Sequence, residues 1–235
     1  MRDRQPDELR PLRLHLSYTD MTPGSVLIEM GRTRVLCTAA IESDIPRWLR
    51  DSGKGWVTAE YGMLPGSSSE RIGRDQDAKG RALEISRLIG RALRSVVDLT
   101  ALGENMVRVD CDVLQADGGT RTAAITGAWV ALHDAITDGV SREVLARNPI
   151  HDHVAAVSVG IVEGMVLLDL DYEDDVRAEV DMNVVMSGRG LLVEVQGTAE
   201  RAPFSRQELD QMLDLAAHGI TELVDAQRQA VAPLG

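Results

Sequence analysis

The stretch "DVLQADGGTRTAAITGAWVALHDAI", from Asp112 to Ile136, joins a strand-like run to a helix-like run through a glycine pair. The alternating segment that leads into it, residues 106–115, predicts a β-strand. Its inward face would carry Val107, Val109, Cys111 and Val113. After Thr120 the apolar residues recur at helical spacing, which predicts a helix through Ile136. A strand that leads through glycines into a helix is the unit from which the rest of the fold can be read.

A β-hairpin and a second helix precede this stretch in the sequence. Residues 25–41 predict a β-hairpin that turns around Gly31. The run "GRALEISRLIGRALRSVVD", which begins at Gly80, predicts a helix. Its apolar face would comprise Leu83, Ile85, Leu88, Ile89, Leu93 and Val96, and its other face carries Arg87, Arg91 and Arg94. The turn-rich segment 65–80 between hairpin and helix is expected to form a loop that is partly mobile.

The second half of the chain repeats the order of strands followed by a helix. Residues 154–162 and 165–172 predict two strands paired around a Glu-Gly turn, and residues 178–186 and 191–197 predict two more. The final helix opens with Ser205-x-x-Glu208, a capping box. We therefore predict an α+β fold, with mixed sheets and packed helices, in a single domain of residues 1–235 with pseudo-duplicated halves 1–145 and 146–235.

Composition narrows the classes of function. The 235 residues carry a formal net charge of −12, which disfavours non-specific binding to nucleic acid. Basic residues nevertheless outnumber acidic ones by seven to four between Ser67 and Arg94, enough for a focused basic groove. No apolar run reaches the roughly 20 residues of a membrane span, and the charged N-terminus does not resemble a signal peptide. Cys37 and Cys111 lie in apolar segments and are expected to be buried thiols, so we predict a cytoplasmic protein without a membrane partner.

The glycine junction has the properties of an anion site. Gly118 and Gly119 let the backbone approach a ligand closely, and the helix start behind them presents unpaired N–H groups and a positive dipole. Arg121 adds a planar donor suited to phosphate oxygens, and Thr120 or Thr122 could cap the helix. An ordinary glycine turn with a helix cap explains the same residues equally well. Arg81 favours the anion site, because a second helix start with an arginine could converge on one small dianion.

The acidic run "LLDLDYEDDVRAEVD" is the second candidate site. On a strand, Asp169 and Asp171 would share one face, and with Asp175 in the next turn they could supply the oxygen ligands that Mg²⁺ prefers. A solvated acidic loop is the alternative. An anion site, a site for a hard metal and a local basic segment together indicate phosphoryl chemistry on a polymer.

The order of motifs resembles that of a known family. "GWVTAEYGMLP", "GRALEISRLIGRALR", "VDCDVLQADGGTRTAAITGA", "AAVSVGIV", "LDLDY" and "EVQGTAE" resemble, over nearly the whole chain, the bacterial ribonuclease PH family, which is similar to exosome ring subunits and to the core domains of polynucleotide phosphorylase. The resemblance implies a ribosomal-protein-S5-domain-2-like fold. It also implies phosphate-dependent 3′→5′ trimming of RNA such as tRNA precursors, with the reverse nucleotidyl transfer from diphosphates, in a homohexamer built as a trimer of dimers.

The resemblance also assigns roles to individual residues. The family's phosphate contacts fall on Arg81, Gly119, Thr120 and Arg121, and two of these, Arg81 and Arg121, would also be catalytic. Its acidic positions, for Mg²⁺ or for a general acid, fall on Asp169 and Asp175 with Asp171 beside them. Asp175 is the favoured general acid, although a metal ligand cannot readily serve as one. The family's RNA-binding arginines would be Arg71 and Arg74.

Departures from the family pattern put RNA binding and substrate preference in question more than the catalytic reaction. The loop between Pro65 and Gly80 is shorter than usual, and Arg201 stands where the family has glycine. A catalytically inactive, exosome-like ring subunit is the alternative function, and a hydrolytic nuclease is a third. Intact phosphate arginines and acidic residues favour the phosphorolytic enzyme, a nucleotidyltransferase with inorganic phosphate as co-substrate.

Overall fold

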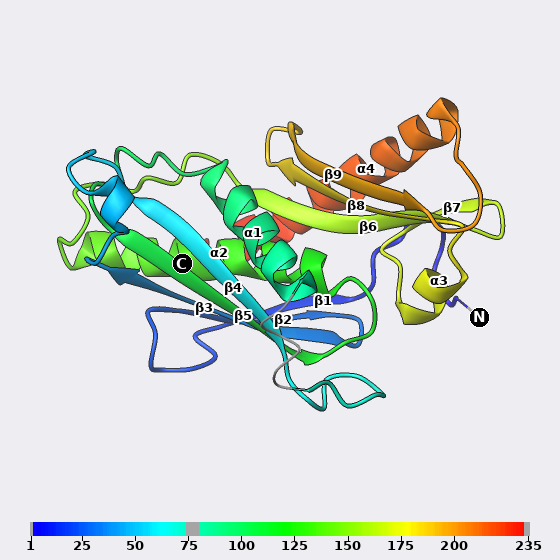
Figure 1. Ribbon diagram of the computed structural model, residues 1–235, viewed down its shortest axis with the longest axis horizontal. Coiled ribbons are helices and arrows are strands. Elements are labelled where there is room, and N and C mark those ends of the chain that lie inside the picture. The colour runs from blue at the N-terminus through cyan, green and yellow to red at the C-terminus, as the bar shows by residue number, and fades with distance from the viewer. Residues whose placement is uncertain (1, 74–79, 233–235) are drawn as a thin grey trace.

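The computed structural model describes residues 2–73 and 80–232, and its elements form two β-sheets with helices packed between and outside them (Figure 1). The elements of the first half are β1 (Leu12–Leu16), β2 (Gly24–Met30), β3 (Thr33–Glu42), the short 3-10 helix η1 (Arg47–Leu49), β4 (Trp56–Met63), α1 (Arg81–Arg94), β5 (Met106–Gln115) and α2 (Thr120–Ser141). Those of the second half are β6 (Val154–Val162), β7 (Met165–Leu168), α3 (Tyr172–Arg177), β8 (Val180–Ser187), β9 (Leu192–Ala199) and α4 (Arg206–Ala230). The predicted α+β class is confirmed.

The first sheet contains the predicted hairpin and the predicted strand 106–115. Its strand order is β1-β2-β3-β5-β4, antiparallel except for the parallel pair of β4 and β5. The inward face of β5 is as expected, since Val107, Val109 and Val113 are fully buried and Cys111 nearly so. Cys37 lies opposite Cys111 in the register of β3 and β5, and both thiols are buried and free, as the sequence predicted.

The second sheet has the order β7-β6-β8-β9 and is antiparallel throughout. Every residue of β6 is buried, because α2 and α4 pack on this strand. The predicted capping box opens α4: the backbone N–H of Glu208 donates to Ser205 Oγ, and the N–H of Ser205 donates to the Glu208 carboxylate. Four strands and a final helix follow one another as predicted, but the structure adds the short helix α3 between β7 and β8, which was not predicted.

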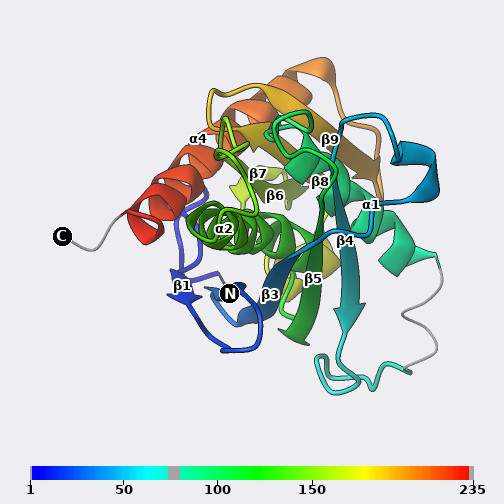
Figure 2. The same ribbon diagram turned by 90° about the vertical axis from the view of Figure 1, so that its left-hand side faces the viewer.

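Helix α2 is the shared core element of the two halves. It packs against β2, β3 and β5 of the first sheet and against β6 of the second (Figure 2). Its middle, from Thr122 to Leu132, is entirely buried, as is typical of a helix that is apolar on every side. The glycine junction that precedes α2 therefore lies where the two sheets meet, and this position determines what can be built around it.

Helix α1 differs in part from the sequence expectation. Its buried face includes Ile85, Leu88, Ile89 and Leu93, but Leu83 is 49% exposed. Of its arginines, Arg91 makes a bidentate ion pair with Glu194 of β9, and Arg94 lies over the ring of Trp56 at 4.3 Å from the ring centroid. These two arginines fasten α1 to its neighbours and are not available as a basic face.

The acidic run does not form the strand that its alternation predicted. Strand β7 ends at Leu168, and Asp169 takes a left-handed backbone conformation with φ of 55°. Asp171 then caps α3, accepting a hydrogen bond from the N–H of Asp174. Leu168 and Leu170 are both buried, and Asp169 is buried between them, so Asp169 and Asp171 do not share a strand face. The prediction was wrong because a turn intervenes.

Within the described residues, no helix is long and apolar enough to span a bilayer.

Candidate active site

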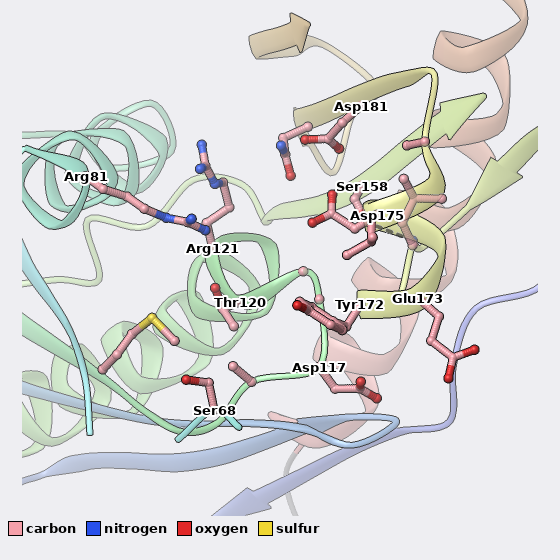
Figure 3. A pocket seen from close by; sticks show the side chains of 18 of the residues that line it. Ser68, Arg81, Asp117, Thr120, Arg121, Ser158, Tyr172, Glu173, Asp175 and Asp181 are labelled. Atoms are coloured by element: carbon pink, nitrogen blue, oxygen red, sulfur yellow. Dashed lines mark hydrogen bonds between the residues drawn. The ribbon is translucent and has the colours of Figure 1, made fainter. Parts of the chain in front are cut away.

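A pocket of about 1020 Å³ opens between the two halves of the molecule. The first half contributes the start of α1, the glycine junction with the start of α2, and the end of β4 with the residues after it. The second half contributes β6, the turn that leads into α3, α3 itself, and β8. Both candidate sites that the sequence singled out therefore contribute to the same cavity (Figure 3).

The glycine junction requires its glycines on steric grounds. Gly118 and Gly119 have φ of 76° and 63°, in the left-handed region that favours glycine. A Cβ atom at Gly118 would also lie 2.6 Å from the backbone carbon of Asp171. The glycine junction thus packs directly against the turn at Asp171 in the second half. This contact places the candidate anion-binding loop next to the acidic residues of that turn.

Arg81 is the first residue of α1 and Arg121 the second residue of α2, and their side chains lie close together at the pocket (Figure 3). Arg81 is exposed, whereas Arg121 is partly buried and donates a hydrogen bond to Gln196 Oε1 at 3.1 Å. The Glu84 carboxylate lies 3.7 Å from Arg121 Nη1. The two positive charges are held in one place by two rigid helices, which is the convergence that the sequence predicted.

Neither helix start is capped by a side chain. The N-cap residues are Gly80 for α1 and Gly119 for α2, and neither has a side-chain cap among the described residues. The expected caps fail because Thr122 donates its hydroxyl to the Gly119 carbonyl, while Thr120 Oγ1 accepts a hydrogen bond from the hydroxyl of Tyr61. The first backbone N–H groups of both helices therefore remain suited to an anion.

Asp175 and Asp181 form the acidic side of the pocket. Asp175 lies on α3, and Asp181 on β8 (Figure 3). Burial raises the pKa of Asp175, and the charges of Arg81 and Arg121 oppose that shift. Burial, with the nearby charge of Asp175, raises the pKa of Asp181 to about 6. Two carboxylates that repel each other favour a shared proton or a bound cation between them.

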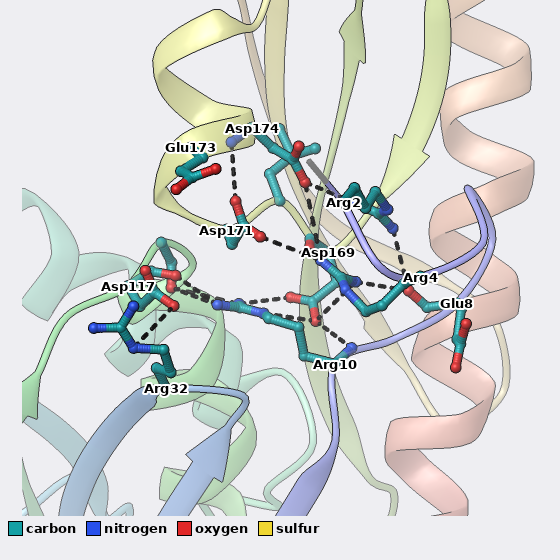
Figure 4. A network of polar contacts seen from close by, with 12 residues as sticks. Arg2, Arg4, Glu8, Arg10, Arg32, Asp117, Asp169, Asp171, Glu173 and Asp174 are labelled. Atoms are coloured by element: carbon teal, nitrogen blue, oxygen red, sulfur yellow. Dashed lines mark hydrogen bonds and ion pairs between the residues drawn. The ribbon is translucent and has the colours of Figure 1, made fainter.

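Asp169 and Asp171 lie outside this acidic pair. Asp169 is fully buried in an ion pair with Arg10, and Asp171 serves as the cap of α3 (Figure 4). Neither carboxylate lines the pocket. Among the described residues, no group of three or more His, Cys, Asp or Glu side chains is gathered in the manner of metal ligands. Of the three predicted aspartates, only Asp175 therefore lines the same pocket as the glycine junction.

The proposed RNA-binding arginines receive no support from contacts. Arg71 is exposed and follows Ser68 and Ser69, which line the pocket, but Arg71 itself does not line it. Arg74 lies outside the described residues. Both remain predictions.

Asp181 is the site residue that the sequence reading missed. Its signal was present, because Asp181 and Asn183 alternate with the buried Val180, Met182 and Val184 along β8 and so face away from the core. Both line the pocket. A strand that alternates in this way places one carboxylate and one amide on the same side.

The raised pKa of Asp181 predicts that the Asp181→Asn variant is more stable than the wild type at neutral pH. A carboxyl whose pKa rises from 3.8 to about 6 on folding destabilises the ionised native state. The gain in unfolding free energy should be roughly 3 kcal/mol well above pH 6 and should shrink as the pH falls toward 4, where the unfolded carboxyl also gains its proton. Urea unfolding of both proteins at several pH values measures it. A gain that does not depend on pH would contradict the electrostatic origin.

The fold consists of two sheets that share a central helix, and it places the protein in the ribosomal-protein-S5-domain-2-like class. The polar pocket between the sheets contains the glycine loop, the paired arginines and the paired aspartates. The chain belongs to the 3′ exoribonuclease family. Residues 8–137 match the model of that family's domain 1, and residues 152–219 match the model of its domain 2.

Known proteins agree with this membership. The chain is 55% identical over 229 residues to the ribonuclease PH of Corynebacterium kroppenstedtii, covering 96% of this chain and 90% of that protein. Among solved structures, an Archaeoglobus fulgidus exosome with RNA bound to the active site matches 95% of this chain and 90% of its own with a TM-score of 0.80 and 20% identity. Rice (Oryza sativa) Rrp46 matches with a TM-score of 0.77 and 18% identity, over 97% of this chain and 98% of its own. At such identities the two structures establish the fold.

Proposed function

We propose that this chain shortens RNA from its 3′ end by phosphorolysis, releasing nucleoside 5′-diphosphates, and that it can run the reverse nucleotidyl transfer from diphosphates. One observation carries the mechanism: two arginines at two uncapped helix starts face a carboxylate pair across one pocket. The 55% identity with a protein named ribonuclease PH supports the activity.

Phosphate is bound by the first half of the site. Arg81 and Arg121 neutralise its charge, and the backbone N–H groups at Gly119 and Thr120 donate to its oxygens at the positive end of α2. Arg121 reaches this position already oriented by its hydrogen bond to Gln196. The arrangement is complementary to a small dianion held at the helix starts, so the nucleophile is oriented before RNA arrives.

The reaction transfers the terminal nucleotide from RNA to phosphate. An oxygen of the bound phosphate attacks the last phosphorus, and the bond from that phosphorus to the preceding 3′ oxygen breaks. The 3′ oxygen leaves on the shortened RNA and takes up a proton. The arginines stabilise the charge that gathers on the two phosphoryl groups in the transition state. Asp175 is the proton donor in this scheme, and Asp181 beside it, whose pKa is raised by burial, can hold the proton that the two carboxyls share.

Asp175 and Asp181 also fit a hard divalent cation such as Mg²⁺. Mg²⁺ is commonly held by one or two carboxylates together with substrate phosphates, and the mutual repulsion of these two carboxylates favours a cation. The bound ion would supply positive charge for the phosphate oxygens of the substrate. The pair replaces the Asp169, Asp171 and Asp175 set expected from the sequence, because Asp169 already neutralises Arg10 and Asp171 caps α3.

RNA 3′ ends such as those of tRNA and rRNA precursors are the proposed substrate, and Arg71 and Arg74 the proposed contacts along the strand. We propose a homohexamer arranged as a trimer of dimers, working in the cytoplasm. Structural likeness to the Archaeoglobus fulgidus exosome supports a ring, and sedimentation of a monomer alone would count against it. An inactive ring subunit is disfavoured because arginines and carboxylates are both in place.

Incubating the full chain with short RNA, with and without inorganic phosphate, tests the activity. Phosphorolysis predicts shortening only when phosphate is present, with nucleoside diphosphates as products. Monophosphates released without phosphate would identify a hydrolase, and RNA of unchanged length under both conditions would identify a scaffold.

A further inference from the structure

A buried ion pair joins the N-terminal segment to the acidic turn. The side chain of Arg10 is 5% exposed, and that of Asp169 is fully buried. Arg10 donates from Nε to one carboxylate oxygen at 3.0 Å and from Nη2 to the other at 2.7 Å, and its backbone N–H adds a third hydrogen bond at 2.8 Å (Figure 4). Such a bidentate pair fixes orientation as well as distance.

The remaining donors of the same guanidinium reach the glycine junction. Arg10 Nη1 donates to the Asp117 carbonyl at 2.6 Å, and Nη1 and Nη2 both lie 3.4 Å from the Gly118 carbonyl. A Cβ atom at Gly119 would lie 2.8 Å from Nη2, so the guanidinium is packed directly under the loop. One planar group therefore contacts the loop that precedes α2 and the turn that precedes α3.

Two further contacts make these positions rigid. Thr33 Oγ1 donates to the Gly118 carbonyl at 2.6 Å and accepts from the Asp117 N–H at 3.0 Å, which fastens the loop to the first sheet. Arg2 donates to the Leu168 carbonyl at 2.7 Å and to Asp174 at 2.8 Å, which fastens both ends of the acidic turn. Arg10 is the link between these two fastened groups.

We propose that Arg10 is a positioning residue that sets the spacing between the phosphate-binding loop and helix α3, and so between bound phosphate and Asp175. Arg10 does not line the pocket, and Asp169 neutralises its charge, so it acts through the two segments and not on the substrate. This inference rests on the proposed phosphorolysis. Displacement of reacting groups by about 1 Å can cost about a hundredfold in rate, which sets the scale of the effect.

The test uses a double variant, Arg10→Gln with Asp169→Asn, in the full chain. Removing both charges together leaves no unpaired buried ion, so this protein is expected to fold, whereas Arg10→Gln alone would strand a buried carboxylate. Arg10→Lys, which keeps the charge but cannot bridge both segments, is the second variant. Arg13→Gln, an exposed arginine on β1, is the matched control. Circular dichroism and thermal melting establish the native fold of each before kinetics.

We expect the double variant to raise KM for phosphate and lower kcat, with a combined loss of about a hundredfold in kcat/KM for phosphate. Arg10→Lys should show a smaller loss in the same direction, and Arg13→Gln none. Affinity for RNA without phosphate should stay at the wild-type value, which a general loss of structure would not allow. Wild-type kcat and KM in either folded Arg10 variant would overturn the proposal. If wild-type protein released no diphosphates at all, the proposed function would have failed instead.

Discussion

Replacing Asp175 by asparagine is expected to lower the turnover number of RNA phosphorolysis by about 10²- to 10⁴-fold, while RNA still binds. The amide keeps the size of the side chain but can neither donate a carboxylic proton nor hold a cation by charge. Asp175 faces Arg81 and Arg121 across the pocket (Figure 3), and in the proposed scheme it gives its proton to the leaving oxygen. Diphosphate release at saturating phosphate and RNA measures the turnover number.

The same variant has a second, independent readout. The charge of Asp175 is one of the causes that raise the pKa of Asp181 to about 6. Its removal should therefore lower the pKa of Asp181, and carboxyl-labelled NMR spectra recorded through a pH titration would follow the change. Glu163→Gln is the control, because Glu163 is exposed and pairs with Arg177 away from the pocket. Unaltered turnover in Asp175→Asn would remove this residue from the mechanism.

Local patterns were enough to predict the parts of the site that local structure determines. The helix that begins at Arg81 and the strand–glycine–helix unit through Gly119 both appear in the structure as the sequence indicated. Their periodicities, glycines and helix starts depend on residues close in sequence. The convergence of Arg81 and Arg121 follows from these elements once the two helices pack on the same sheet.

The acidic turn could not be predicted in this way. Its course depends on Arg10, which contacts Asp169 across 159 positions of sequence, and the run "LDLDY" alternates like a strand whether or not that contact forms. Asp169 looked like a ligand because its type suits a metal, and only the tertiary structure shows that an arginine already occupies its oxygens. Asp181 had a readable alternation, but its approach to Asp175 depends on how the chain returns from α3 into β8.

Replacing Arg121 by alanine is expected to lower kcat/KM for phosphate. The expected loss of transition-state stabilisation is about 2–4 kcal/mol, the range found for other preorganised donors. Arg121 occupies the first turn of α2, directly after the phosphate-type loop, and its guanidinium is oriented by Gln196. The loss should appear mainly as a raised requirement for phosphate, because the proposed role of Arg121 is to bind the attacking phosphate. Initial rates across a wide range of phosphate concentration determine kcat and KM separately.

Arg121→Lys distinguishes charge from geometry in the same experiment. A lysine keeps one positive charge but lacks the planar fork that matches two phosphate oxygens, so it should recover only part of the loss. Arg87→Ala is the matched control, since Arg87 is exposed on α1 and does not line the pocket. Because Glu84 lies 3.7 Å from Arg121, the Glu84→Gln variant should lower KM for phosphate by releasing the guanidinium from a competing anion. Wild-type phosphate dependence in Arg121→Ala would contradict the assignment of Arg121 to phosphate binding. That result would not depend on the role of Asp175 and Asp181.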